Sequence, residues 1–179
     1  SKELGGQIEK ISWLGRELIA APVKENFPNK EESFKDLKPY IIDDGMGLID
    51  LSITKRGEYR FRRSYNISHN DLLDEYQIEV IYNVMNLSRT KKLHQQWTQE
   101  LLFTGHKEIV KDANTVSTGH AIALTYGEKK LNLKVAQVNV FKPMVEIKGS
   151  NVKMGSSQDK LIESREKLKW KVIYTLKQN

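Results

Sequence analysis

Residues 167–177 alternate apolar and charged side chains without interruption, and no other feature of the chain constrains its fold as strongly. One set of alternate positions is apolar (Leu168, Trp170, Val172, Tyr174 and Leu176) and the other holds lysines (Lys167, Lys169, Lys171 and Lys177). Successive side chains of a β-strand point to opposite faces. The pattern therefore indicates a strand with one buried face and one wet, basic face, integral to a sheet.

Several other segments also favour strands. Residues 40–42 and 48–53 flank the turn residues Asp43–Gly47, and Arg56-Gly57 separates the second segment from 58–65, which predicts an antiparallel hairpin. Short strands are expected at 98–104, 120–126, 131–135, 138–140 and 145–147, and a flexible polar loop at 149–159.

Residues 69–87 carry apolar side chains at helical spacing. Leu72, Tyr76, Val80, Val84 and Leu87 recur at three- and four-residue steps, and Ser68 lies three residues before Asp71, as in a helix cap. We expect a helix over 69–87. The β-branched run 78–81 leaves a strand open as the alternative for its middle.

The first 39 residues are expected to form an arm. Apolar residues recur at helical steps over 3–20, although Gly5, Gly6 and Gly15 weaken the pattern, and the proline-containing stretch 22–39 is typical of a linker. The expected organisation is an N-terminal amphipathic helix and linker over 1–39, and a single domain over 40–179. The expected fold class is α+β: a small twisted antiparallel sheet with one packed helix.

The motifs that would indicate an enzyme are missing from the sequence. It contains no nucleophile elbow, zinc-protease motif or P-loop, and the absence of cysteine excludes thiol catalysis. The four histidines share no metal-ligand spacing with one another or with a carboxylate. We therefore expect a non-enzymatic protein without a metal or a cofactor.

Charge is distributed unevenly along the chain. Residues 1–50 contain seven Lys/Arg and ten Asp/Glu, so the remaining 22 Lys/Arg and 13 Asp/Glu give residues 51–179 a net charge of +9. A basic body favours a polyanionic partner, either an anionic membrane or nucleic acid. The residues expected to contact it are Lys55, Arg56, Arg60, Arg62, Arg63, Arg89, Lys91, Lys92, Lys129 and Lys130. Arg60 and Arg62 share one face of their predicted strand, whereas Arg63 shares the other with Tyr59 and Phe61.

The apolar stripe of the arm needs a partner surface, because a short helix is marginal alone in water. That surface could belong to its own domain, to a neighbouring subunit or to a membrane. We favour a neighbouring subunit. The candidate residues for self-association are then Leu4, Ile8, Ile11, Trp13 and Leu18.

The order of these elements resembles the matrix proteins of rhabdoviruses. The matching stretch is Gly57–Tyr65, with its alternating aromatic and arginine residues, and then a helix through Leu72–Tyr76. The segments 122–126, 131–140 and 145–147 follow in the expected order. The resemblance implies a protein of the virion and of the host cytoplasm or inner membrane face. Such a protein self-associates and bridges an anionic membrane and the viral nucleocapsid or its RNA during assembly and budding.

Two departures from that family point to a divergent branch. The four prolines are never adjacent, so the budding motif Pro-Pro-x-Tyr is absent, and the arm is acidic on balance. The alternative function is a scaffold or subunit-docking module of a bacterial envelope or secretion assembly.

Overall fold

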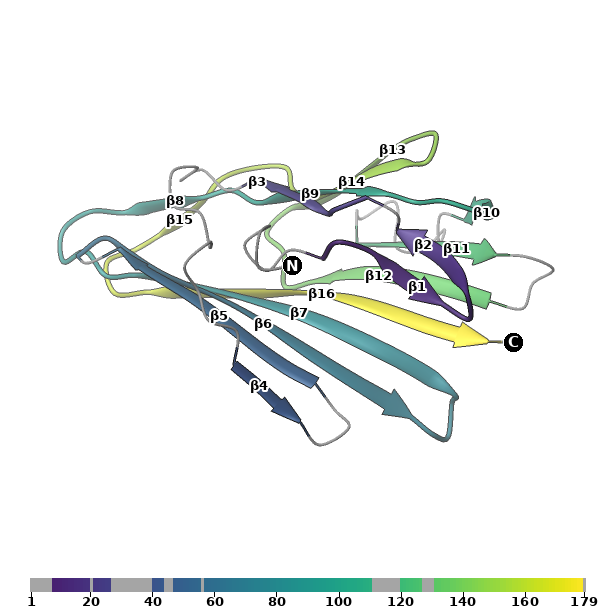
Figure 1. The fold of residues 1–179 in the computed structure, drawn as a ribbon. Coiled ribbons are helices and arrows are strands. Elements are labelled where there is room, and N and C mark those ends of the chain that lie inside the picture. Colours follow the sequence, from purple (N-terminus) through teal and green to yellow (C-terminus); the bar gives the residue numbers. More distant parts are fainter. Residues whose placement is uncertain are drawn as a thin grey trace.

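The computed structural model of this chain is built from β-strands (Figure 1). It describes residues 8–19, 21–26, 40–43, 47–55, 57–110, 120–126 and 131–178. Every regular element within these residues is a strand, and none of them belongs to a helix long and apolar enough to cross a membrane.

Eight strands in the described part form one large antiparallel sheet. In spatial order they are β10 (His106–Val110), β11 (Ala121–Tyr126), β12 (Leu131–Val138), β16 (Lys167–Gln178), β7 (Glu75–Asn86), β6 (Tyr59–Asn70), β5 (Gly47–Lys55) and β4 (Tyr40–Asp43). The C-terminal strand β16 lies in the middle of this sheet, paired with β12 on one side and β7 on the other. The predicted strand at the C-terminus is confirmed.

A smaller sheet covers part of one face of the large sheet (Figure 1). Its order is β13 (Pro143–Lys148), β14 (Asn151–Ser156), β9 (Thr98–Leu102) and β3 (Lys24–Asn26). Two short pairs complete the described strands, namely β1 (Ile11–Trp13) with β2 (Arg16–Ile19), and β8 (Leu93–Gln95) with β15 (Lys160–Ile162).

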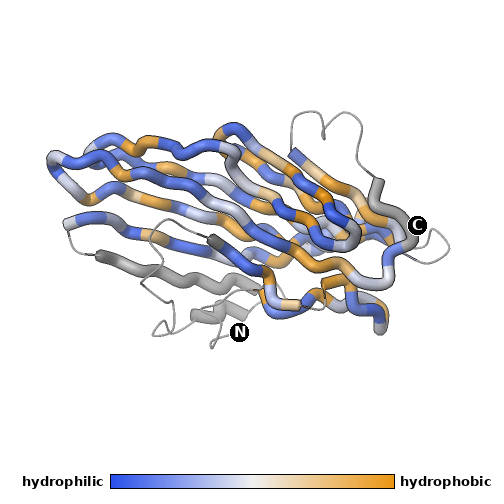
Figure 2. The backbone as a smooth tube through the Cα atoms, turned by 90° about the horizontal axis from the view of Figure 1, so that it is seen from above, coloured by the Kyte–Doolittle hydropathy of each residue, from blue (hydrophilic) through white to orange (hydrophobic). Residues whose placement is uncertain are grey.

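The core lies between the two layers. Leu101, Val152 and Met154 of the small sheet are buried in one cluster with the inner side chains of β7, β12 and β16. Along the long strands hydrophobic and hydrophilic residues alternate (Figure 2), so one face of the large sheet, the inner face, is packed. Its other side, the outer face, carries mainly polar side chains, with Ile81, Met85 and Ile173 half-buried among them.

The expected α+β fold is wrong, because residues 69–87 form a hairpin instead of a helix. Strand β6 runs to Asn70, a turn spans 71–74, and β7 follows from Glu75. Tyr76, Val80 and Val84 are four residues apart, a spacing that suits both a helix and alternate positions of a strand. Ile78 and Tyr82 fill the positions between them, so the even-numbered residues from 78 to 84 all pack in the core, while Tyr76 lies on the same face but is 36% exposed. Burying these four alternate residues decides between the two periods.

The expected helical arm is also a hairpin in its described part. Leu14 and Gly15 have φ angles of 47° and 74° and connect β1 to β2. Positive φ at both central residues is the requirement of a two-residue type I′ turn, which glycine meets without strain. Gly15, which weakens the helical pattern, is thus part of the turn.

The apolar residues of this hairpin pack on the chain's own core. Ile11 and Leu18 are buried, and Ile8 and Trp13 pack against the same cluster. Trp13 also meets the ring of Tyr76 edge-on, with the centroids 4.5 Å apart. Of the three partner surfaces considered, these contacts fit the chain's own domain. Leu4 lies outside the described residues.

The loop expected at 149–159 contains strand β14, which pairs with β9 and β13. Gly155 makes this pairing possible. It has a φ of 152°, and a Cβ there would overlap the carbonyl oxygen of Trp97. Only glycine allows the two backbones to approach this closely.

The hairpin β1–β2 offers a test of this packing. Leu18 has 0% exposure, whereas Leu14 has 66%. We expect Leu18→Ala to lower the free energy of unfolding by about 2–5 kcal/mol, because a buried leucine leaves a cavity. Leu14→Ala should change it by less than about 0.5 kcal/mol. Urea unfolding of the dilute protein measures both. Equal effects of the two substitutions would contradict this packing.

Candidate functional site

The outer face of the large sheet carries a group of cations at one end. Arg60 and Arg62 lie on this face of β6 and are exposed, as their shared position along the strand predicts. Lys167 and Lys169 lie on the same face of β16. Met85 pairs with both Arg60 and Lys167, and Asn83 pairs with both Arg62 and Lys169. The four cations therefore stand at the corners of a rectangle of about 7 by 10 Å, with β7 between them.

Two loops add cations at the same end of the sheet. The connection after β7 carries Arg89, Lys91 and Lys92, and the turn before β16 carries Arg165; all four are exposed. The hydroxyl of Ser164 donates to the carbonyl oxygen of Ser88 at 2.7 Å, so these loops lie against each other. Sequence regions near 60, 90 and 165 therefore meet in space.

Asn86, the last residue of β7, holds these loops in place and is itself buried. Its Nδ2 donates to the carbonyl oxygens of Lys91 at 2.8 Å and Ile162 at 3.0 Å, while its Oδ1 accepts from the Ser88 N–H at 2.9 Å. Its backbone carbonyl accepts from the Arg165 N–H at 3.1 Å. A buried amide with its hydrogen bonds satisfied fixes the loop backbone.

We call these eight exposed residues the basic face: Arg60, Arg62, Arg89, Lys91, Lys92, Arg165, Lys167 and Lys169. Lys92 pairs with Glu163 at 2.6 Å. Six of the eight have no carboxylate partner among the described residues, namely Arg60, Arg89, Lys91, Arg165, Lys167 and Lys169. Farther along the outer face the lysines are neutralised, because Lys171 pairs with Glu79 and Lys177 with Glu75. The unpaired charge is thus concentrated at one end.

Five of the ten residues predicted to contact an anionic surface belong to the basic face. The prediction missed Arg165, Lys167 and Lys169, although the alternation in β16 already assigned the two lysines to a wet face. Arg56, Lys129 and Lys130 lie outside the described residues; Lys55 ends β5, and its side chain lies outside them too.

The prediction that Arg63 contacts an anionic surface is wrong, because its side chain has 0% exposure. It lies on the inner face of β6, where it forms an ion pair with Glu25 of β3. Tyr82 donates its hydroxyl proton to the same carboxylate. The pair connects the small sheet to the large one.

Burial and charge shift the pKa values in this cluster. Burial alone would lower the pKa of Arg63, but Glu25 and the neighbouring tyrosines outweigh it, so the pKa is raised and the guanidinium stays protonated. Burial raises the pKa of Tyr65, Tyr82 and Tyr174 well above the ordinary value, and the Glu25 carboxylate raises them further.

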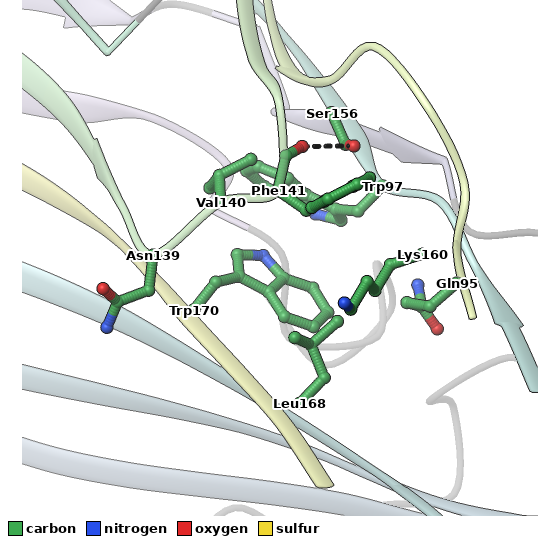
Figure 3. A pocket seen from close by; sticks show the side chains of 9 residues that line it. All are labelled: Gln95, Trp97, Asn139, Val140, Phe141, Ser156, Lys160, Leu168 and Trp170. Atoms are coloured by element: carbon green, nitrogen blue, oxygen red, sulfur yellow. Dashed lines mark hydrogen bonds between the residues drawn. The ribbon is translucent and has the colours of Figure 1, made fainter. Parts of the chain in front are cut away.

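An apolar recess lies between the sheets, beside the inner face of β16 (Figure 3). Its accessible space is about 20 Å³, enough for one water molecule and far below the 300 Å³ or more of typical small-molecule sites. Its walls include Trp97, Phe141, Leu168 and Trp170. The Lys160 side chain reaches into it, with Nζ 5.0 Å from the Phe141 ring centroid. The described residues contain no cluster of three metal-ligating side chains.

The buried ion pair yields a stability prediction. Arg63→Met leaves the Glu25 carboxylate buried without its cation, so we expect a loss of about 3–5 kcal/mol in the free energy of unfolding. Adding Glu25→Gln removes the charge and keeps an acceptor for the Tyr82 hydroxyl, so the double variant should recover most of that loss. Urea unfolding measures this cycle, and a double variant as unstable as Arg63→Met would contradict the coupling.

The tyrosines yield a pH dependence. Above pH 10, the usual tyrosine pKa, the unfolded chain loses phenolic protons that the folded chain retains, so stability falls as the pH rises. Tyr174→Phe should spare about 1.4 kcal/mol of the loss between pH 8 and pH 11. Urea unfolding at both pH values measures the loss of unfolding free energy in the two proteins. An identical loss in the variant would refute the contribution of Tyr174.

Comparison with protein-family models and with curated proteins finds no match to this chain. The interpretation of the site therefore depends on its own geometry.

Proposed function

We propose that this protein binds nucleic acid non-enzymatically, through contacts between its basic face and the phosphate backbone. The observation that carries the proposal is the set of six exposed cations without carboxylate partners at one end of the large sheet. Lysine and arginine that neutralise phosphates release counterions, which supplies most of the affinity in sequence-independent binding.

The type of contact follows from what the outer face presents. None of its described side chains on β6, β7, β12 and β16 is aromatic. Base stacking and base-edge readout therefore have no support there, whereas long Arg and Lys side chains reach phosphates. We propose binding that depends on charge and is indifferent to sequence.

The position of the exposed apolar residues favours nucleic acid over a membrane. Leu72 and Leu73, exposed at the turn between β6 and β7, are the side chains best placed to enter a bilayer. They lie at the opposite end of this hairpin from the basic face, because β6 runs eight residues from Arg62 to Asn70, about 27 Å, before it reaches their turn. One flat membrane contact would not use both the cations and these leucines.

The more specific role of a rhabdovirus-type matrix protein stays a prediction, as does the alternative of a bacterial scaffold. The stretch that carried the resemblance, Gly57–Tyr76, forms a turn and two strands rather than a strand and a helix. The present proposal therefore does not depend on it.

The test compares two triple variants with equal loss of charge. Arg60→Ala, Lys167→Ala and Lys169→Ala remove cations of the basic face, whereas Lys10→Ala, Lys148→Ala and Lys153→Ala remove the same charge elsewhere. Binding to a fluorescent single-stranded oligouridine is measured by anisotropy over a salt series. We expect the first variant to lower the steepness of log K against log salt by about 2, at about 0.7 per phosphate contact, and the control to leave it nearly unchanged.

Binding to anionic vesicles distinguishes a membrane from nucleic acid as the partner of the basic face. We expect weaker binding to phosphatidylserine vesicles than to RNA at the same salt concentration. Binding to these vesicles without binding to RNA would overturn the proposal in favour of a membrane surface. Equal effects of the two triple variants on RNA binding would show that the basic face is not the site.

A further inference from the structure

We infer that the recess beside β16 binds one monovalent anion of about the size of chloride. Its ligands are the indole N–H groups of Trp97 and Trp170 and the ammonium group of Lys160, and all three side chains line the recess. The recess lies on the inner side of β16, whereas the basic face is on its outer side. The inference is therefore independent of the proposed nucleic-acid binding.

Two buried hydrogen-bond donors in the recess lack an acceptor in the protein. The Nε1 atoms of Trp97 and Trp170 are buried, and neither has a hydrogen-bond partner among the described residues. Both side chains are almost fully enclosed, with 2% and 3% exposure. An indole N–H can only donate, and a buried donor that stays unsatisfied is costly. These two groups thus indicate an acceptor that the protein itself does not supply.

The two indoles and the lysine converge on one space. The indole ring centroids lie 5.9 Å apart with their planes at 55°, and both nitrogens face the recess (Figure 3). The Lys160 side chain reaches into the same recess, with Nζ 5.0 Å from the Phe141 ring centroid. Lys160 has no carboxylate partner in the part of the chain that the structure describes. The recess therefore holds a positive charge and two oriented donors.

The size of the recess selects a single small ion. Its accessible space is about 20 Å³, somewhat more than the roughly 10–15 Å³ that one water molecule requires. An ion slightly larger than water, such as chloride, fits this space. Phosphate and carboxylate groups, with several heavy atoms, do not.

The donor set favours an anion over a water molecule. A water molecule accepts at most two hydrogen bonds and must place two protons of its own, whereas the recess offers three donors. The Ser156 hydroxyl on the recess wall already donates to the Phe141 carbonyl oxygen at 2.6 Å (Figure 3). A halide accepts from all three donors and donates nothing. The Lys160 ammonium compensates its charge, as a buried ion requires.

The indole N–H signals test the inference, because the chain contains only three tryptophans. Chloride replaces gluconate, which is too large for the recess, at constant sodium concentration and pH, and ¹H–¹⁵N spectra of the labelled protein are recorded. We expect the Trp97 and Trp170 signals to shift along one saturating curve. Trp13, assigned by its loss in Trp13→Phe, is the internal control: its Nε1 is also buried and unpartnered among the described residues, and its signal should stay nearly unchanged.

Two results of this titration would overturn the inference. If neither recess signal shows a saturable shift, the indoles are satisfied by a water molecule only. If all three signals shift equally, chloride acts as a bulk salt and not at this site.

Two lysine variants identify the cation of the site. Lys160→Met removes the ammonium group, so the half-saturating chloride concentration should rise about tenfold or more, as expected for losing a charged hydrogen bond. Lys142→Met is the matched control. Lys142 lies outside the recess lining, its Nζ is 5.8 Å from the Phe141 ring centroid, and it donates to the Gln158 Oε1 at 2.7 Å.

We expect Lys142→Met to leave the half-saturating concentration nearly unchanged. Equal effects of the two variants would overturn the inference, because chloride would then respond to the net charge of this surface. The titration of the unaltered protein decides the question even if a variant does not fold.

Discussion

The packing of Trp97, with its ring tilted against those of Trp170 and Tyr82, fixes the relation between the two sheets. The ring centroids of Trp97 lie 5.1 Å from Tyr82 and 5.9 Å from Trp170, and Tyr82 and Trp170 are themselves stacked at 5.2 Å. Aromatic contacts of this kind contribute about 0.5–1.5 kcal/mol each beyond the area that they bury. Tyr82 of β7 and Trp170 of β16 point inward, so the residues at the alternate positions of each strand point outward. Lys167 and Lys169 reach solvent as a result.

The sequence predicts those strands in which the alternation is complete. β16 follows this rule, and so does β6, where Arg60 and Arg62 were assigned to the face opposite Arg63. The pattern fails where apolar residues are four apart, because that spacing suits a helix and a strand equally, as at Tyr76, Val80 and Val84. The intervening Ile78 and Tyr82 favour the strand, but only the packing of β7 between β6 and β16 settles the choice.

The candidate site could be predicted only in pieces. Clusters near residues 60 and 90 stand out in the sequence, but their meeting with Arg165 depends on the antiparallel order of β6, β7 and β16 and on the hydrogen bonds of Asn86. No local pattern identifies an asparagine as the centre of such a network. Likewise, Arg63 lies in a basic run and gives no sign that Glu25, 38 residues earlier, is its partner.

The alternation along β16 also separates binding from folding. Leu168 and Trp170 lie on the inner side of the strand, between the two sheets, whereas Lys167 and Lys169 belong to the basic face on the outer side. A phosphate backbone on the outer face therefore contacts side chains that take no part in the packing between the sheets. Because the two sets of residues alternate along one strand, the order that the core imposes on Leu168 and Trp170 also fixes the positions of the two lysines.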